Sequence, residues 1–219
     1  MFDYILANSS RILDGLARHL YIIGASLPIS VTIGVSAGIL ISRNKRAERI
    51  VIGIANILMT IPSLALFGFA IIIMSPLGMG IGVPPAIFAL VIYSFLPITR
   101  NTVLALHAVP SSTIEAARGM GMTPKQILRR IQLPLAIPLL MAGIRNACVM
   151  GVSVTTIAYL VGAGGMGHFI FAGMTRTRLD MVLAGAVIVA VLGIATNYLL
   201  VILERAVTPR GLMLDQQKE

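Results

Sequence analysis

Long runs of apolar residues, separated by short polar or glycine-rich segments, make up most of this chain. Runs of about 20 residues with few charges are typical of transmembrane helices. The pattern predicts five such spans, over approximately residues 19–42, 50–74, 84–106, 135–161 and 181–203. Prolines inside these runs are compatible with spans, because neighbouring helices satisfy the freed backbone groups. We therefore expect an all-α, polytopic membrane helix bundle.

The beginning of the chain has a different pattern. In residues 4–17, Ile12 and Leu16 fall on one helical face, whereas Arg11 and Asp14 favour the other. We predict an N-terminal segment, residues 1 to 18, whose amphipathic helix lies on the membrane surface. The alternative is that these residues are the extramembrane beginning of the first span.

Two features divide the apolar runs. The sequence Thr-Ile-Pro-Ser at residues 60–63 interrupts the second run, and its proline predicts a kink there. The uncharged residues 75–83 and the glycine-rich residues 162–180 are expected to be external loops.

Composition supports a membrane protein and charge indicates its orientation. The 219 residues are 57% hydrophobic and 11% charged, too apolar for a soluble domain. Cytoplasmic loops carry an excess of Lys and Arg, so the net charge of +9 indicates topology control rather than nucleic-acid binding. The segments predicted to be cytoplasmic hold Arg43, Lys45, Arg46, Arg49, Arg100, Arg118, Lys125, Arg129, Arg130, Arg205, Arg210 and Lys218. The external segments hold only Arg11, Arg18, Arg176 and Arg178. Five spans with the N-terminus outside and the C-terminus inside satisfy this bias, and residues 205–219 then form a cytoplasmic tail.

The polar segment 112–134 predicts two short helices joined by a tight turn. Ser112 and Glu115 match a capping box that can start the first helix. Gly121 can end it, since glycine adopts the left-handed conformation most easily. Thr123 can cap a second helix, with proline at its first position and glutamine completing a second box. The proline at residue 134 marks the start of the next span.

This spaced pattern resembles the EAA loop of permease subunits of ABC importers. The residues that carry the resemblance are Glu115, Ala116, Ala117, Gly121, Ile131, Leu133 and Pro134. Further stretches resemble the osmoprotectant branch of these permeases, at residues 60–66, 97–102, 119–123, 141–145, 162–167 and 204–212. His168 departs from that pattern, in which an aspartate or similar polar residue is expected.

The resemblance implies a type I importer in the bacterial cytoplasmic (inner) membrane, with residues 19–204 as its transmembrane domain. Two permease subunits, identical or different, would form the pore. Two cytoplasmic ATPases would bind ATP and Mg, and an external solute-binding protein would deliver the ligand. The implied substrates are quaternary amines such as glycine betaine, carnitine and choline. A methionine-type importer is the alternative, because it shares the glycine pattern of residues 162–167.

The same segment 112–134 suits contact with an ATPase on physical grounds. Ala116 and Ala117 add little bulk, so the first helix can enter a groove, while Glu115 and Arg118 can form charge-assisted bonds at its rim. The predicted ATPase-coupling residues are Glu115, Ala116, Ala117, Arg118, Gly121, Met122 and Thr123.

The fourth span carries the polar residues of a candidate translocation path. An ionisable residue inside a membrane is costly, and for Arg145 we favour snorkelling or pairing over substrate contact. The candidate path residues are Asn146, Ser153, Thr155 and Tyr159. Their alternative role, and that of Thr156, is to hold helices together through hydrogen bonds.

Other classes of protein fit less well. His19, His107 and His168 are scattered, and no catalytic or metal-binding motif or P-loop is present, so ATP hydrolysis would occur on another polypeptide. We expect no catalytic residue, metal or cofactor on this chain. No acidic residue lies within a predicted span, which disfavours a secondary transporter. Cys148 is expected to be a packing residue. With no tryptophan, the high-affinity amine site is expected elsewhere.

Overall fold

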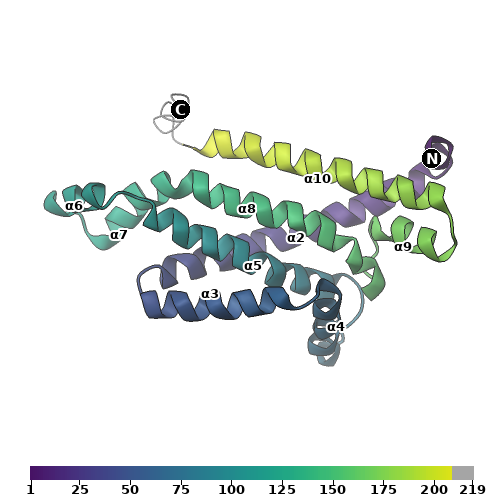
Figure 1. Cartoon of the computed structure of the whole chain (residues 1–219), viewed down its shortest axis with the longest axis horizontal. Coiled ribbons are helices and arrows are strands. Elements are labelled where there is room, and N and C mark those ends of the chain that lie inside the picture. The colour runs from purple at the N-terminus through teal and green to yellow at the C-terminus, as the bar shows by residue number, and fades with distance from the viewer. Residues whose placement is uncertain (209–219) are drawn as a thin grey trace.

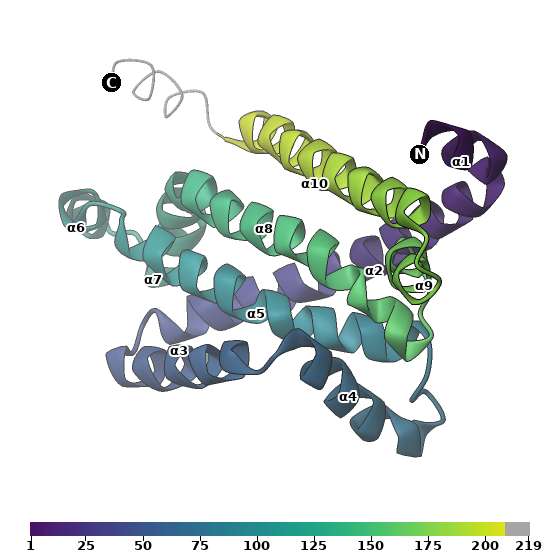
Figure 2. The same ribbon diagram turned by 45° about the vertical axis from the view of Figure 1, so that its right-hand side comes forward.

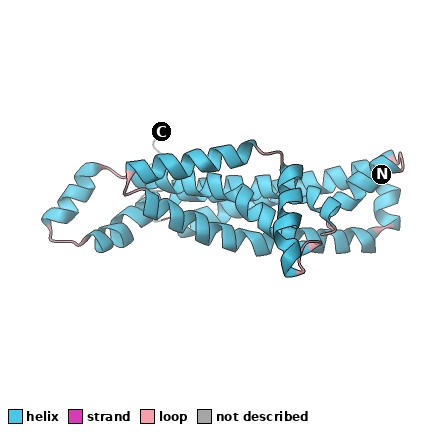
Figure 3. Ribbon diagram, turned by 90° about the horizontal axis from the view of Figure 1, so that it is seen from below, coloured by secondary structure: helices cyan, strands magenta, loops and turns pink. Residues whose placement is uncertain are grey.

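The computed structural model describes residues 1–208, and all regular elements in that part are helices (Figure 3). The long helices run side by side, as Figure 1 shows. The elements are α1 Phe2–Ala7, α2 Ser9–Ile41, α3 Lys45–Thr60, α4 Ser63–Met74, the 3₁₀ turn η1 Ser75–Leu77, α5 Val83–His107, α6 Ser111–Gly119, α7 Pro124–Ile127, the π-helical turn η2 Leu128–Gln132, α8 Leu133–Thr155, the 3₁₀ turn η3 Ile157–Val161, α9 Gly167–Thr175 and α10 Leu179–Val207. The predicted tail 205–219 lies mostly outside the described residues.

Four helical segments of the described chain are long and apolar enough to cross a membrane: Ser9–Ile41, Val83–His107, Pro124–Thr155 and Leu179–Val207. A fifth span follows if α3 and α4 are counted together, although they meet at 104°. The break expected at residues 60–63 is therefore confirmed, but it is a sharp corner rather than a kink. Proline excludes its predecessor from the helical region, and Ile61 is extended there.

The beginning of the chain differs from the single surface helix expected over residues 4–17. A break at Asn8 separates α1 from α2, and residues 9–17 are the first turns of α2. Ile12 is buried with Met166 and Phe169, so this apolar face packs against the chain itself. The arrangement agrees with the alternative, in which these residues begin the first span. Whether α1 lies at the membrane surface stays a prediction.

Small residues bring α2 and α5 close together. Ser26, Ser30, Gly34 and Gly38 recur at every fourth position of α2, and all are buried. A Cβ atom on Gly38 would lie 2.5 Å from the Cβ of Thr102 on α5. Residues without bulk at such a stripe let two membrane helices approach closely and gain van der Waals contact.

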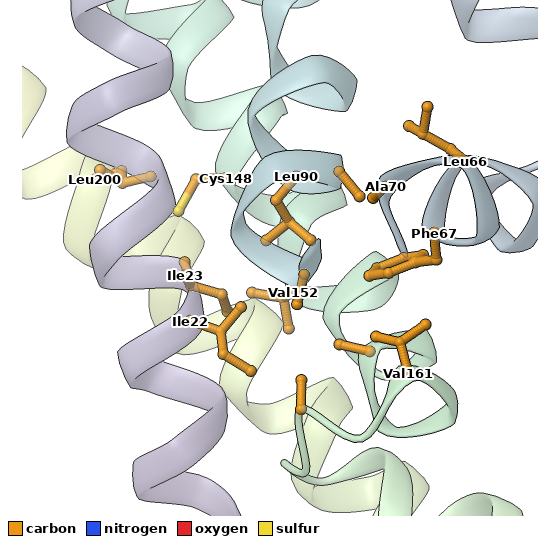
Figure 4. Close-up of a cluster of buried hydrophobic side chains, with 14 residues drawn as sticks. Ile22, Ile23, Leu66, Phe67, Ala70, Leu90, Cys148, Val152, Val161 and Leu200 are labelled. Atoms are coloured by element: carbon orange, nitrogen blue, oxygen red, sulfur yellow. The ribbon is translucent and has the colours of Figure 1, made fainter. Parts of the chain in front are cut away.

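The main core lies where α2, α4, α5 and α8 meet (Figure 4). It includes Ile22 of α2, Phe67 of α4, Leu90 of α5 and Val152 of α8. Cys148 is buried in the same cluster, which confirms its expected packing role. The first two turns of α4 after the bend pack on this core, and Phe67 there is fully buried.

The last helix, α10, lies at the edge of the bundle (Figure 2). Only 6% of the residues in the 18-residue apolar window of α10 are buried, so most of the surface of this helix is available to lipid or to another chain. The C-terminal end of α10 lies at the same end of the molecule as α6, whereas the N-terminus lies at the other end (Figure 1). This placement agrees with an odd number of spans.

Candidate functional site

The turn between α6 and α7 has the geometry expected from its glycine. Gly121 has a φ of 77°. Its N–H donates to the carbonyl of Arg118 at 2.9 Å, and the N–H of Met122 donates to that of Ala117 at 3.1 Å. These two bonds form a Schellman motif, which satisfies the last carbonyls of α6. Gly121 therefore makes the turn tight, as predicted.

One of the two predicted capping boxes is present. The N–H of Thr123 donates to Oε1 of Gln126 at 2.8 Å, and the N–H of Gln126 donates to Oγ1 of Thr123. The box expected at Ser112 is wrong. Helix α6 begins earlier, at Ser111 after Pro110, and it has no side-chain cap. Ser112 consequently lies inside the first turn, where its hydroxyl is not in the capping position.

The second helix does not end before Pro134, contrary to expectation. It continues through η2 into α8, so residues Pro124–Thr155 form one helical path. The N–H of Leu133 bonds to the carbonyl of Leu128, five residues earlier. A π-type turn contains one extra residue, which accommodates a proline that lacks an N–H group. The α6–α7 hairpin, defined as residues 111–127, is therefore joined directly to the fourth span.

The hairpin extends beyond the end of the bundle (Figures 1 and 3). Glu115, Ala116 and Arg118 are exposed on α6, whereas Ala117 is fully buried. Among the other predicted coupling residues, Gly121 and Thr123 are exposed and Met122 is half-buried.

Sequence reasoning missed an apolar side chain at the tip of the hairpin. Met120 is 74% exposed, directly before the turn. A flexible, polarisable side chain at that place is suited to enter a pocket of another protein. Its signal in the sequence is an apolar residue just before the helix-ending glycine of a polar segment.

A groove of about 790 Å³ lies between α8, α9 and α10. Its wall on α8 includes Val149 and Ser153, with Thr156 directly after that helix, and its wall on α10 includes Asn197 and Tyr198. Most of the other lining residues are aliphatic. Asn197 and Tyr198 were not singled out from the sequence, although they are adjacent polar residues inside the apolar run 181–203.

Some of the candidate path residues line this groove and others do not. Ser153 lines it, whereas Asn146 is exposed but is not among the lining residues. Thr155 is fully buried, and its hydroxyl donates to the carbonyl of Gly151 at 2.7 Å. This position favours the helix-packing role for Thr155. A role in translocation for Asn146, Ser153 and Tyr159 stays a prediction.

Tyr159 lies at the other end of α8 in an aromatic cluster. Its ring centroid is 5.3 Å from that of His168 and 6.3 Å from that of Phe171. Helix α9, which supplies both partners, lies within residues 162–180, where only a loop was expected. Burial lowers the pKa of His168, and the charges of Arg176 and Arg11 lower it further.

Arg145 forms an ion pair. Its Nη1 lies 3.2 Å from Oε2 of Glu204, near the C-terminal end of α10. Both side chains are partly buried, at 33% and 23% exposed. The pairing expected for Arg145 is present, and its partner comes from 59 residues later in the chain; the preference for this role over substrate contact stays a prediction.

His19 connects α2 to two other parts of the fold. Its ring is fully buried, with Nε2 3.1 Å from the carbonyl oxygen of Val152 and Nδ1 3.4 Å from the amide nitrogen of Met166. One neutral tautomer satisfies both, with Nε2–H donating and Nδ1 accepting. The Val152 carbonyl is free for this bond because the N–H of Thr156 donates to Ser153 instead. The glycine-rich segment is therefore held against the bundle at Met166.

Within residues 1–208, no group of three or more His, Cys, Asp or Glu side chains could hold a metal ion. An exposed hairpin is continuous with α8, and α8 forms one wall of the groove.

Comparison with known proteins relates this arrangement to transport. A sequence model described as "binding-protein-dependent transport system inner membrane component" matches residues 30–209. The chain is 41% identical over 209 residues to the osmoprotectant import permease protein OsmW of Salmonella typhimurium, covering 95% of this chain and 97% of that protein. It is 38% identical over 212 residues to the glycine betaine/carnitine/choline transport system permease protein OpuCB of Bacillus subtilis, covering 97% and 95%. Among solved structures, an inward-facing form of the MetNI methionine ABC transporter matches with a TM-score of 0.82 and 28% identity, covering 90% of this chain and 96% of that one.

Proposed function

The chain belongs to the family of binding-protein-dependent transport system inner membrane components, and on that basis we propose that it is the permease subunit of an ATP-driven importer for quaternary-amine osmoprotectants such as glycine betaine. The observation that carries the proposal is full-length similarity, at 41% and 38% identity, to permeases named for these solutes. Methionine is the second candidate. Its support is a structural match at 28% identity, and the fold it reflects is compatible with either substrate.

The α6–α7 hairpin is the contact with a cytoplasmic ATPase in this proposal. Glu115, Ala116 and Arg118 present a small, charged and exposed surface, and Met120 projects beside it. The ATPase would bind ATP and Mg, and its movements would reach α8 through the continuous helical path Pro124–Thr155. The hairpin end of the bundle is then the cytoplasmic end, with the N-terminus outside.

The groove between α8 and α10 is the part of the translocation path that this subunit contributes. Its aliphatic walls carry a few hydroxyl and amide groups from Ser153, Thr156 and Asn197, which suits a small polar solute in transit. A second permease, identical or different, would cover its open side. A solute-binding protein would deliver the ligand at the opposite end from the hairpin.

Uptake measurements distinguish the two substrates. The chain is expressed with its ATPase and binding-protein partners in cells that lack their own uptake of glycine betaine and methionine. We expect accumulation of labelled glycine betaine that depends on all the components, and only background accumulation of methionine. Uptake of methionine alone would contradict the osmoprotectant assignment and support the second candidate.

A matched pair of methionine variants tests the hairpin contact. Met120→Ser removes an exposed apolar side chain from the hairpin, and Met79→Ser removes one from the turn after α4, where Met79 is 48% exposed. An apolar anchor at an interface typically contributes more than about 1 kcal/mol, or roughly fivefold in affinity. We expect the ATPase to co-purify about fivefold less with Met120→Ser and unchanged with Met79→Ser. Equal recovery with both variants would exclude Met120 from the contact.

A further inference from the structure

The Arg145–Glu204 ion pair lies at the end of the groove that is nearer to the α6–α7 hairpin. Arg145, Val149 and Ser153 are spaced by four residues, which places them on one face of α8, and Thr156 follows directly after the helix. The last three line the groove. Arg145 therefore continues this wall by one turn, about 6 Å closer to the hairpin.

The opposite wall continues in the same direction. Asn197 of α10 lines the groove, and Glu204 follows seven residues later on the same face, about 10 Å further along the axis. The two helices run in opposite directions, since α8 leads away from the hairpin and α10 returns toward that end (Figure 1). Their side chains meet at 3.2 Å, so the ion pair crosses between the two walls at the hairpin end of the groove.

The charges of this pair determine which solutes could pass it. Glu204 neutralises Arg145, so the pair does not repel a quaternary ammonium as an isolated arginine would. Separating two partly buried charges is costly unless each finds a new partner. A solute with both a carboxylate and a quaternary ammonium offers one to each side chain: its carboxylate can accept from the Arg145 guanidinium, and its ammonium can lie beside the Glu204 carboxylate. A solute with only the ammonium can satisfy only Glu204.

We propose that Arg145 and Glu204 close the cytoplasmic end of the groove, and that a zwitterionic solute opens this closure by pairing with both side chains. This inference rests on the proposed function. Arg145 lies on the helix that continues from the hairpin, so a displacement of the hairpin moves it relative to Glu204. Arg145 is then a specificity residue that recognises the carboxylate of the solute.

Uptake of two solutes tests the recognition. Labelled glycine betaine carries a carboxylate and labelled choline does not. We expect Arg145→Gln to reduce betaine uptake about tenfold, which corresponds to one lost charge-assisted interaction, and not to reduce choline uptake, because choline has no carboxylate to pair with Arg145. Arg145→Lys keeps the charge and is expected to retain betaine uptake within about threefold. A loss that is equal for both solutes would overturn the assignment of Arg145 to the carboxylate.

The matched control removes an arginine from another ion pair. Arg178 pairs with Asp180 at 2.6 Å but does not line the groove. Arg178→Gln is expected to leave the ratio of betaine to choline uptake unchanged. A shift in that ratio equal to the shift for Arg145→Gln would also overturn the assignment.

Thiol labelling tests the closure without reference to the solute. Ser153→Cys is introduced together with Cys148→Ala, which leaves one thiol in the chain, on the groove wall. Inside-out vesicles that carry the full complex are treated with a membrane-impermeant maleimide. We expect labelling to be about tenfold faster when Arg145→Gln is added, the same factor as for loss of the ion pair.

Unchanged labelling would overturn the closure. If Arg145→Gln accelerates labelling but the complex with the original Arg145 imports neither betaine nor choline, the closure is supported and the proposed function is refuted. The two failures are therefore distinguishable.

Discussion

Replacement of Gly121 by alanine isolates the contribution of a single backbone conformation to coupling. Gly121 has a φ of 77°, and no atom lies within 4 Å of the position that a Cβ would take. The added methyl group therefore meets no neighbour, and its whole effect is backbone strain. An L-residue in the left-handed region costs about 1–2 kcal/mol. That energy shifts the balance between the tight turn and other conformations of the hairpin by a factor of about 5–30.

Gly119 provides the control for this substitution. It lies two residues earlier, at the last position of α6, and a Cβ there would also have no atom within 4 Å. Alanine is favoured over glycine inside a helix by about 1 kcal/mol. Gly119→Ala therefore adds the same methyl group without strain. Gly121→Asn is a third variant, since asparagine tolerates the left-handed conformation better than alanine.

The assay is the initial rate of labelled glycine betaine uptake, normalised to the amount of permease in the membrane. We expect Gly121→Ala to reduce the rate about 5–30-fold at normal membrane levels, Gly121→Asn to reduce it less, and Gly119→Ala to leave it unchanged. Uptake by Gly121→Ala at the rate of the unmodified protein would refute the role of this turn. An equal loss in Gly119→Ala would attribute the effect to the exposed surface of α6 instead.

Three further predictions concern stability, each measured as the thermal midpoint of the detergent-solubilised protein. Gly38→Leu should lower the midpoint, because a Cβ would lie 2.5 Å from that of Thr102 and overpacking costs about 1–3 kcal/mol; Gly24→Ala on the same helix, with open space around it, should not. His19→Ala should lower it as well, since a buried carbonyl and a buried amide lose their partner at about 1–3 kcal/mol each, and an unchanged midpoint would argue against these bonds. The lowered folded-state pKa of His168 means that the unfolded chain binds a proton first as the pH falls through 6.5, so stability is lost on acidification. His168→Gln should reduce the drop in midpoint between about pH 7.5 and about pH 5.5, and an identical drop in both proteins would contradict this reasoning.

The helix boundaries predicted from prolines and glycines are partly right and partly wrong in this chain. The break predicted from Pro62 and the left-handed turn predicted from Gly121 are both present, because proline fixes its own φ and glycine tolerates a positive φ whatever surrounds them. Pro134 predicts a boundary between two helices, but a π-type turn lets the helix continue through it. Ser112 matches a capping box by spacing alone, whereas the observed N-cap is Pro110, two residues earlier.

The candidate groove could be only partly anticipated. Ser153 and Thr155 are two residues apart in one polar run, yet Ser153 lines the groove and Thr155 is fully buried. A helix turns by about 100° per residue, so neighbours in the sequence point in different directions, and the position of α10 decides which direction is the groove. The period of four in the small residues of α2 could have predicted its close contact, but not that α5 is the partner.

The sequence by itself determined the apolar spans, the break after Thr60, the glycine turn and the charged surface of the hairpin, because each depends on residues within one or two turns of each other. Only the tertiary structure decided that Arg145 pairs with Glu204, that His19 bonds to Val152 and that α8 and α10 enclose a groove. Those partners are distant in the chain, and local propensity carries no information about which distant side chain the packing of helices will bring within hydrogen-bond distance.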